Sequence, residues 1–218
     1  MQAGLSNFRA GIDIGGTFTD FILLDEAAAA IRLHKCLTTP SDPSRGALDG
    51  LRDIVSAAGI SVAEIGEIVH GTTLVTNAVI ERKGAAVGLL TTEGFRDVLE
   101  IGSEQRYDIY DLFLTFPEPL VSRSRRLEIS ERIGADGGVI KPLDEVSVLR
   151  AVKALVADKV EAIAVCLMHS YRNSAHERRV RDIIRQHYPK ISVSISSEVV
   201  AEISEYPRFV TTCANAYV

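Results

Sequence analysis

The sequence predicts an α/β fold built on a mixed sheet, and two features of its hydrophobic pattern predict it. Near the N-terminus, three stretches of alternating apolar and polar residues follow one another through short turns. Further along, short apolar runs alternate with segments of helical periodicity. Strands joined by short turns pair antiparallel, whereas strands separated by helices form βα units. We therefore expect an antiparallel three-stranded start that leads into βα units, with helices on the faces of the sheet.

Clear start and stop signals define the elements of the first half. Asp42 is a good N-cap, Pro43 suits the first helical position, and Gly59 suits the position after the last turn. Thr72 or Thr73 can cap a second helix. In order, we expect strands at residues 8–14, 17–25 and 31–39, a helix at 43–58, a strand at 65–70, a helix up to 84 and a strand at 86–91.

The second half begins with an irregular stretch, residues 93–142, which contains Pro117, Pro119 and a cluster of arginines. We interpret it as an insertion with a hairpin, after which the α/β rhythm resumes in residues 143–203. A last helix is expected to begin near Ser204. The remaining elements are expected as a helix at 143–158, a strand at 162–168, a helix at 175–187 and a strand at 191–195.

Composition sets limits on the class of protein. The 218 residues are 46% hydrophobic and 24% charged, values of an ordinary globular protein with a sizeable core. A formal net charge of -5 argues against a general affinity for nucleic acid or for an anionic membrane. No signal peptide is recognised, and no apolar run reaches the roughly 18 residues that span a bilayer. Three widely spaced cysteines are typical of a reducing compartment, so we expect a cytoplasmic protein.

The most informative stretch is the glycine turn between the first two strands. It is neither a Walker P-loop nor a dinucleotide fingerprint, because strand and not helix follows the glycines. Gly15 and Gly16 lack Cβ atoms, so their N–H groups can approach an anion, and the hydroxyls of Thr17 and Thr19 can add donors. Asp13 beside the turn can hold Mg²⁺ between itself and bound phosphates. A Gly-Gly pair can also simply close a hairpin, but that reading leaves the clustered threonines and carboxylate unexplained.

A second candidate stretch lies where the expected strand 65–70 gives way to a helix. The free N–H groups near Gly71, Thr72 and Thr73 and the helix dipole favour an anion. His70 and Asn77 lie close enough in the sequence to line the same site. In the alternative reading, Thr72 only caps the helix, His70 only packs, and Asn77 is an exposed amide.

Residues 13–20, Asp-Ile-Gly-Gly-Thr-Phe-Thr-Asp, resemble the first phosphate motif of the actin, sugar kinase and heat-shock chaperone ATPase superfamily. The version here is most similar to that of the hydantoinase A/5-oxoprolinase family. Further stretches similar to that family extend over nearly the whole chain. They are His70-Gly71-Thr72-Thr73, Thr76-Asn77-Ala78, Glu81-Arg82-Lys83-Gly84, Thr92-Glu93-Gly94-Phe95-Arg96-Asp97, Tyr110-Asp111-Leu112, Glu131-Arg132, Ala164-Val165-Cys166-Leu167, His169-Ser170-Tyr171-Arg172-Asn173 and Glu205-Tyr206-Pro207-Arg208.

The resemblance implies a domain organisation. Residues 1–92 would form a phosphate-binding lobe of the ribonuclease H-like type. Residues 93–142 would be the irregular insertion, 143–203 a second α/β segment, and 204–218 the start of a truncated linker helix. Because no second glycine-rich adenosine motif is present, we expect the isolated chain to bind ATP weakly or not at all.

The resemblance also implies an activity. Family members couple ATP hydrolysis to the opening of cyclic amides such as hydantoins or 5-oxoproline, and many work with a second large subunit. Catalytic roles would then fall to Asp13, Thr17 and His70, with Asp13 holding Mg²⁺. ATP would be bound by Gly15, Gly16, Thr17, Thr19, Gly71, Thr72, Thr73 and Asn77. Three alternatives stay open: an ATP-dependent carboxylase subunit for ketones such as acetone, an ATP-driven conformational clamp, and a small-molecule kinase, which would leave a stable phosphorylated product.

Overall fold

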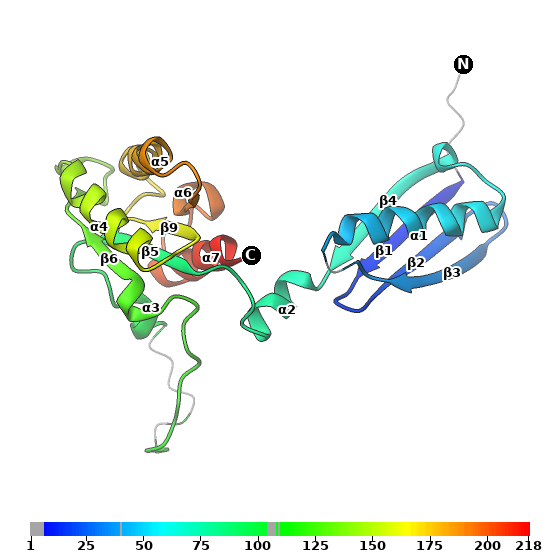
Figure 1. The fold of residues 1–218 in the computed structure, drawn as a ribbon, viewed down its shortest axis with the longest axis horizontal. Coiled ribbons are helices and arrows are strands. Elements are labelled where there is room, and N and C mark those ends of the chain that lie inside the picture. Colours follow the sequence, from blue (N-terminus) through cyan, green and yellow to red (C-terminus); the bar gives the residue numbers. More distant parts are fainter. Residues whose placement is uncertain (1–6, 40, 104–107, 109) are drawn as a thin grey trace. The chain divides into compact units, whose positions relative to one another are not determined.

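The structure, a computed structural model, describes residues 7–39, 41–103, 108 and 110–218. The chain divides into two compact units, Met1–Glu81 and Arg82–Val218, here called unit 1 and unit 2. Both units contain helices and strands (Figure 1), which confirms the mixed α/β fold class. Each unit is described by itself.

Unit 1 is a four-stranded mixed sheet with the strand order β3-β2-β1-β4. The first three strands pair antiparallel, and β4 returns to lie parallel to β1 after a helical connection. This is the predicted antiparallel start followed by a βα unit. Its elements are β1 (Phe8–Ile14), β2 (Phe18–Asp25), β3 (Ala30–Leu37), α1 (Pro43–Ala58), the 3₁₀ turn η1 (Val62–Glu64), β4 (Ile65–Thr72) and α2 (Leu74–Ile80).

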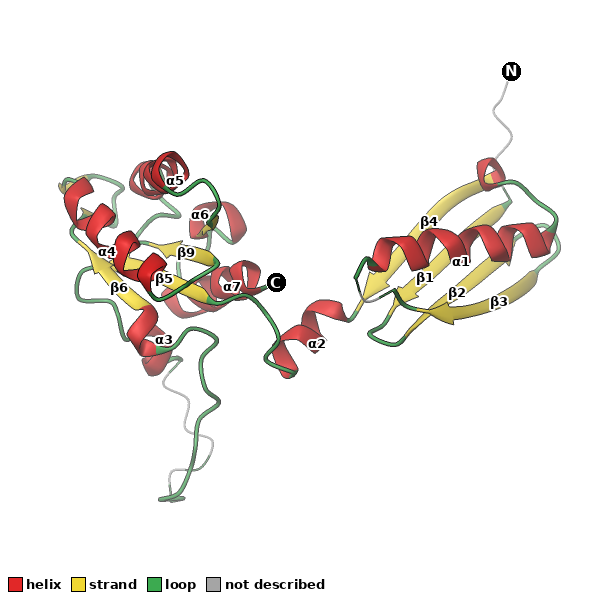
Figure 2. Cartoon of the chain, in the orientation of Figure 1, coloured by secondary structure: helices red, strands yellow, loops and turns green. Residues whose placement is uncertain are grey.

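The core of unit 1 lies on one face of this sheet only. Phe21 and Leu23 on β2 point to this inner face, where Leu51, Ile54 and Val55 of α1 pack against them. Figure 2 shows α1 lying along the sheet. Because side chains alternate along a strand, Ile22, between Phe21 and Leu23, points to the opposite, outer face, and so does its cross-strand partner Leu33.

Unit 2 contains a second four-stranded sheet, in which all strands are parallel and follow the order β10-β9-β5-β6. A separate two-stranded hairpin is formed by β7 and β8. Its elements are β5 (Val87–Thr92), α3 (Val98–Ile101), the 3₁₀ turn η2 (Arg123–Arg125), β6 (Arg126–Ile129), β7 (Arg132–Ile133), β8 (Val139–Lys141), α4 (Glu145–Ala157), β9 (Ala162–Cys166), α5 (Ala175–His187), β10 (Ser192–Ile195), α6 (Ser196–Val199) and α7 (Glu205–Tyr217).

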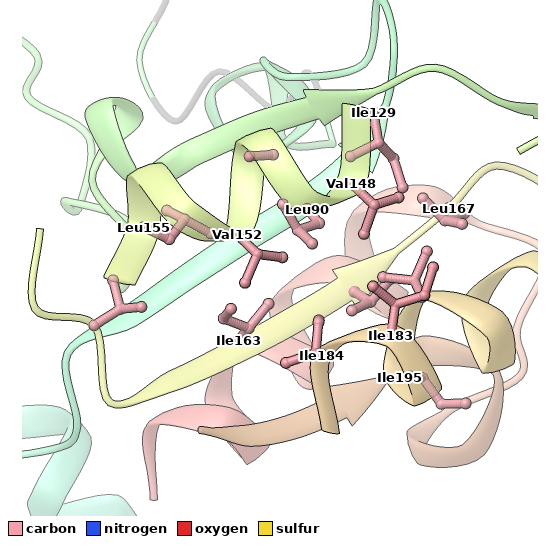
Figure 3. Close-up of a cluster of buried hydrophobic side chains, with 14 residues drawn as sticks. Leu90, Ile129, Val148, Val152, Leu155, Ile163, Leu167, Ile183, Ile184 and Ile195 are labelled. Carbon is pink, nitrogen blue, oxygen red and sulfur yellow. The ribbon is translucent and has the colours of Figure 1, made fainter. Parts of the chain in front are cut away.

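Helices cover both faces of the second sheet, as a parallel sheet requires. On one face α4 and α5 bury an aliphatic cluster that includes Leu90, Val152, Ile163 and Ile184 (Figure 3). On the other face lies α7, whose Phe209 is fully buried. The two central strands, β5 and β9, are therefore buried along their whole length, whereas the edge strands β6 and β10 carry polar residues.

Buried charges fasten α7 and α5 to the carboxyl ends of this sheet. The fully buried Glu177 carboxylate accepts hydrogen bonds from the backbone N–H of Leu167 (2.9 Å) and Ser197 (2.8 Å) and from the Ser196 hydroxyl (2.6 Å). The Arg208 guanidinium donates to the Leu167 carbonyl oxygen (2.8 Å) and to Ser196 (2.7 Å). The Glu177 carboxylate thus obtains partners in place of the water it loses, whereas Arg208 obtains them at one of its three guanidinium nitrogens.

The two ends of unit 2 meet at Gly84 and Tyr217. The N–H of Ala85 donates to the Tyr217 carbonyl oxygen (2.8 Å). A Cβ at Gly84 would lie 2.2 Å from the Tyr217 ring, so only glycine fits at this contact. The segment that leads into β5 and the last turn of α7 therefore lie side by side.

Three expectations about organisation are corrected. The boundary lies after Glu81 and not at residue 92, because β5 pairs with β9 and β6 and so belongs to the second sheet. Residues 93–142 supply a strand of that sheet, β6, besides their hairpin. Residues 204–218 form α7, which packs on the sheet of unit 2 and is not a linker.

Candidate functional site: the glycine turn of unit 1

The glycine turn, Gly15, Gly16 and Thr17, joins β1 to β2 and is closed by a hydrogen bond from the Gly15 N–H to the Phe18 carbonyl oxygen (3.0 Å). A Cβ at Gly15 would lie 2.9 Å from that oxygen, closer than Cβ atoms come in real structures. The turn therefore needs glycine at this position for its own closure. Gly16 and Thr17 are exposed, and no hydrogen bond found in the described part of the chain uses their N–H groups. These two donors are available to a ligand.

Thr38, which follows β3, braces the turn from one side. Its N–H donates to the Thr17 carbonyl oxygen (3.0 Å), and its hydroxyl donates to the Gly15 carbonyl oxygen (2.8 Å). The fully buried Thr19 hydroxyl lies 2.9 Å from the Thr38 hydroxyl. The sequence analysis did not single out Thr38. It could have been recognised as a threonine that directly follows the strand expected to pair with β2.

The end of β4 and the start of α2 brace the turn from the other side. The Ile14 carbonyl oxygen accepts hydrogen bonds from the Thr72 hydroxyl (3.0 Å) and the Thr73 N–H (3.2 Å). Asn77, on α2, lies so close to Gly16 that a Cβ there would be 3.2 Å from Nδ2 of Asn77. The strand pairing thus brings Thr72, Thr73 and Asn77 to the glycine turn.

Asp13 lies one residue before the end of β1 on the outer face, where it is exposed. Its strand neighbours are Gly71 on β4 and Asp20 on β2, and the Asp20 carboxylate forms an ion pair with Lys35 (2.8 Å). Gly71 adds no side chain beside Asp13, so the carboxylate has open space on that side. The described residues contain no group of three or more side chains that could hold a metal ion. Mg²⁺ commonly takes one or two carboxylates together with phosphate oxygens and water, and Asp13 fits that role.

The structure separates two predicted site residues from the others. His70 pairs with Ile12, so its side chain points to the inner side of the sheet, whereas Asp13 and Gly71 share the outer side. Thr19 points into the core beneath the turn. From this position its hydroxyl supports Thr38 and does not face a bound anion.

The sheet of unit 1 thus ends in a three-residue hairpin turn with free N–H groups. The Asp13 carboxylate and the Asn77 amide lie next to this turn. The model of the hydantoinase/oxoprolinase N-terminal region matches residues 9–188. The chain belongs to this family.

Relatives and solved structures agree with this membership. The chain is 39% identical to the caprolactamase subunit alpha of Pseudomonas jessenii over 216 residues, which are 96% of the chain and 31% of the relative. It is 38% identical to the acetophenone carboxylase gamma subunit of Aromatoleum aromaticum, covering 94% of the chain and 30% of that relative.

Two solved structures share the fold. A nucleotide-free acetone carboxylase matches with a TM-score of 0.84 at 30% identity, over 97% of this chain and 32% of the other. The ATP-dependent caprolactamase from Pseudomonas jessenii matches with a TM-score of 0.80 at 38% identity, over 96% and 31%. The chain therefore spans about a third of the length of these relatives. No helix in the described residues is long and apolar enough to cross a membrane.

Proposed function

We propose that this chain is the phosphate-binding part of an ATP-dependent enzyme that opens a cyclic amide. The observation that carries the proposal is the glycine turn, whose two free N–H groups and flanking carboxylate form a site for phosphate and a metal ion. The turn is held by hydrogen bonds on both sides before any ligand arrives. Such a fixed set of donors stabilises charge at little cost in reorganisation.

Each residue near the turn has a distinct part in this proposal. The N–H groups of Gly16 and Thr17 and the Thr17 hydroxyl contact phosphate, and Asp13 holds Mg²⁺, which neutralises phosphate charge. Gly15 shapes the turn, while Thr72, Thr73 and Asn77 line its other wall beside Gly71. Thr19 acts through Thr38 as a positioning residue. His70 has no catalytic role here, because it projects from the inner face.

The chemistry requires ATP because an amide carbonyl is a weak electrophile. Transfer of the γ-phosphoryl group to the lactam oxygen breaks its bond to ADP, forms a P–O bond to the lactam and converts that oxygen into a leaving group. A first water adds to the carbon, and the C–N bond breaks with a proton passing to nitrogen, which leaves an acyl phosphate. A second water adds to the same carbon, and the C–O bond breaks to release phosphate and the carboxylate. The chain's contribution is to position the phosphates and neutralise their charge.

A second candidate function is ATP-dependent carboxylation of a ketone. It is favoured by the similarity to the acetophenone carboxylase gamma subunit and to acetone carboxylase. Phosphorylation of an enolate oxygen would use the same turn, so the turn itself does not distinguish the two substrates. Because two of these relatives are named as subunits, we also propose a second large subunit as partner. The free cysteines Cys36, Cys166 and Cys213 favour a reducing compartment, and we propose the cytoplasm.

The test uses the full-length gene product expressed with its neighbouring subunit. Phosphate release is measured with hydantoin, 5-oxoproline, caprolactam, acetone and acetophenone, each with and without bicarbonate. A lactam carrying ¹⁸O in its carbonyl should transfer the label to the released phosphate. Bicarbonate-dependent turnover of a ketone would favour the second candidate. ATP hydrolysis that no lactam or ketone accelerates would contradict both and favour an ATP-driven clamp.

The 218-residue chain alone is expected to bind ATP weakly and to turn nothing over, since it spans only a third of its relatives. Calorimetry with ATP and Mg²⁺ tests this expectation directly. A low-micromolar affinity for the isolated chain would contradict it.

A further inference from the structure

The outer face of the unit 1 sheet carries large apolar side chains that nothing in the described part of unit 1 covers. On β2 and β3 the cross-strand pairs Ile22–Leu33 and Phe18–Leu37 point outward together. The relative exposure of these side chains is high, from 43% for Phe18 to 75% for Leu33. The outer face, as used below, comprises Phe18, Ile22, Ile31, Leu33, Leu37 and Val69.

Soluble proteins seldom leave a contiguous apolar surface of this kind open to water. The sheet also contains a parallel pair, β1 and β4, and sheets with parallel strands are normally covered on both faces by helices. In unit 1, α1 provides one of these layers, on the inner face. The second layer is the unexplained element.

Gly11 lies in the middle of the outer face, and its environment indicates how closely the covering layer approaches. Its strand neighbours are Ile22 on one side and Val69 on the other. A Cβ at Gly11 would meet only the Ile22 Cβ, at 3.9 Å, which is an ordinary contact. Nothing within the unit therefore requires glycine here. A glycine in the interior of a strand weakens the strand, and it often marks a place where another backbone comes close.

Apart from Asp13, at the end next to the glycine turn, the charged side chains on the outer side of these strands already have partners. Arg9 forms an ion pair with Glu67, and Lys35 pairs with Asp20 and lies 4.8 Å from the Phe18 ring centroid. An apolar surface with a self-neutralised rim offers little to steer a transient charged partner. It suits permanent packing of the type found inside a domain.

We propose that a helix from the same polypeptide docks on the outer face, and that this helix belongs to the length that the relatives have beyond the matched third. Its apolar side rests on Ile22, Leu33 and Val69, and Gly11 admits it close to the sheet backbone. The caprolactamase subunit alpha and the acetophenone carboxylase gamma subunit each have about two thirds of their chain outside the match, which is ample length for such a helix. A helix fits better than a strand because the face offers side chains, not free backbone groups.

Thiol accessibility tests this proposal. Ile22→Cys and Leu33→Cys are made in a Cys36→Ala background, in the 218-residue chain and in the product of the full gene. The matched control is Leu48→Cys, which lies on α1 away from the outer face and has a similar exposure of 54%. We expect maleimide to modify all three sites equally fast in the short chain. In the full product, the two outer-face sites should react at least about tenfold more slowly than the control, because a packed face reacts only when it opens.

Each other outcome overturns the proposal. Equal reactivity at all sites in the full product means that no element covers the face. Protection already present in the short chain identifies another part of this chain as the cover if it is independent of concentration, and a second copy if it rises with concentration.

Gly11→Val provides a second reading that does not depend on labelling. In the short chain its side chain fits beside Ile22, so the melting temperature should change little. In the full product the same side chain meets the docked helix, and the melting temperature should fall by about 5 °C or more. An equal change in both forms would contradict close docking at Gly11.

Discussion

The hydrogen-bond chain beneath the glycine turn gives a prediction whose size follows from the structure. Thr38→Val keeps the shape of the side chain but removes its hydroxyl, which donates to the Gly15 carbonyl oxygen (2.8 Å) and contacts the Thr19 hydroxyl (2.9 Å). Thr38 and Thr19 are 6% and 0% exposed, so water cannot readily replace these bonds. A net value of about 1 kcal/mol per bond, plus the cost of a stranded buried hydroxyl, predicts a loss of about 2–3 kcal/mol in unfolding free energy.

Thr19→Val removes one bond and leaves Thr38 able to donate to Gly15, so we expect a loss of about 1 kcal/mol. The double variant should lose about as much as Thr38→Val alone, because no hydroxyl is then stranded. The two changes are therefore expected to be non-additive by about 1 kcal/mol.

Urea unfolding of the three variants tests this cycle, with hydrogen exchange used to assign the transition of unit 1. The matched control is Thr76→Val on the exposed side of α2, which should cost less than about 0.5 kcal/mol. Strictly additive losses would refute the hydrogen-bond chain. Losses no larger than the control would refute the bracing of the turn.

Four further outcomes are expected. In the full enzyme, Asp13→Asn should lower the rate of phosphate release by at least about two orders of magnitude without affecting folding. The control Asp20→Asn should lower the rate far less, because the Asp20 carboxylate already pairs with Lys35. Similar rates for the two variants would remove Asp13 from the mechanism. Gly16→Ala places a Cβ 3.2 Å from Nδ2 of Asn77 and should weaken nucleotide binding, and adding Asn77→Ala should recover part of the loss in a binding titration if steric contact is the cause. Glu177→Gln replaces an acceptor of three buried hydrogen bonds by an amide and should cost about 2–4 kcal/mol in denaturant unfolding, unlike the exposed Glu145→Gln. Burial raises the pKa of the Cys213 thiol to about 12, so iodoacetamide should not modify Cys213 in the native protein at pH 8. Because the thiol ionises at lower pH in the unfolded chain than in the folded one, the free energy of unfolding should fall as the pH rises from about 9 towards 12.

The local pattern was sufficient to predict most of the elements and the glycine turn. Alternation along β2 distinguishes Phe21 and Leu23 from their outward neighbours, and Asp42 and Pro43 mark the start of α1. The hydrophobic pattern failed to predict which sheet a strand joins when the strand is buried on both faces. Residues of β5 are buried on both faces, so nothing in that run says which sheet it joins, and the boundary was placed too late. β6 was missed because it is short and begins with Arg126, a charged residue that is 1% exposed.

Site residues followed the same division. Asp13, Gly16 and Asn77 were proposed from their residue types and from the family resemblance, and the fold places all three near the glycine turn. His70 was expected to line the same site, but its pairing with Ile12 directs its side chain to the inner side of the sheet. Thr38 was missed because it acts through hydrogen bonds to the Gly15 and Thr17 carbonyl oxygens, more than 20 positions earlier in the sequence. Only the pairing of β2 with β3 brings these groups together.

The contact between Gly84 and Tyr217 has a consequence for how this architecture can be assembled. In unit 2, Gly84, in the segment that leads into β5, contacts Tyr217, the last residue of α7, and the N–H of Ala85 donates to the Tyr217 carbonyl oxygen. A domain whose first and last residues lie close together can be inserted into a loop of another domain. The two residues of the host loop that flank the insertion then stay close to each other, so the host fold is not disturbed. Unit 2 therefore meets the geometric requirement for an inserted module, and residues 85–216 could be replaced by a short linker without pulling the flanking chain apart.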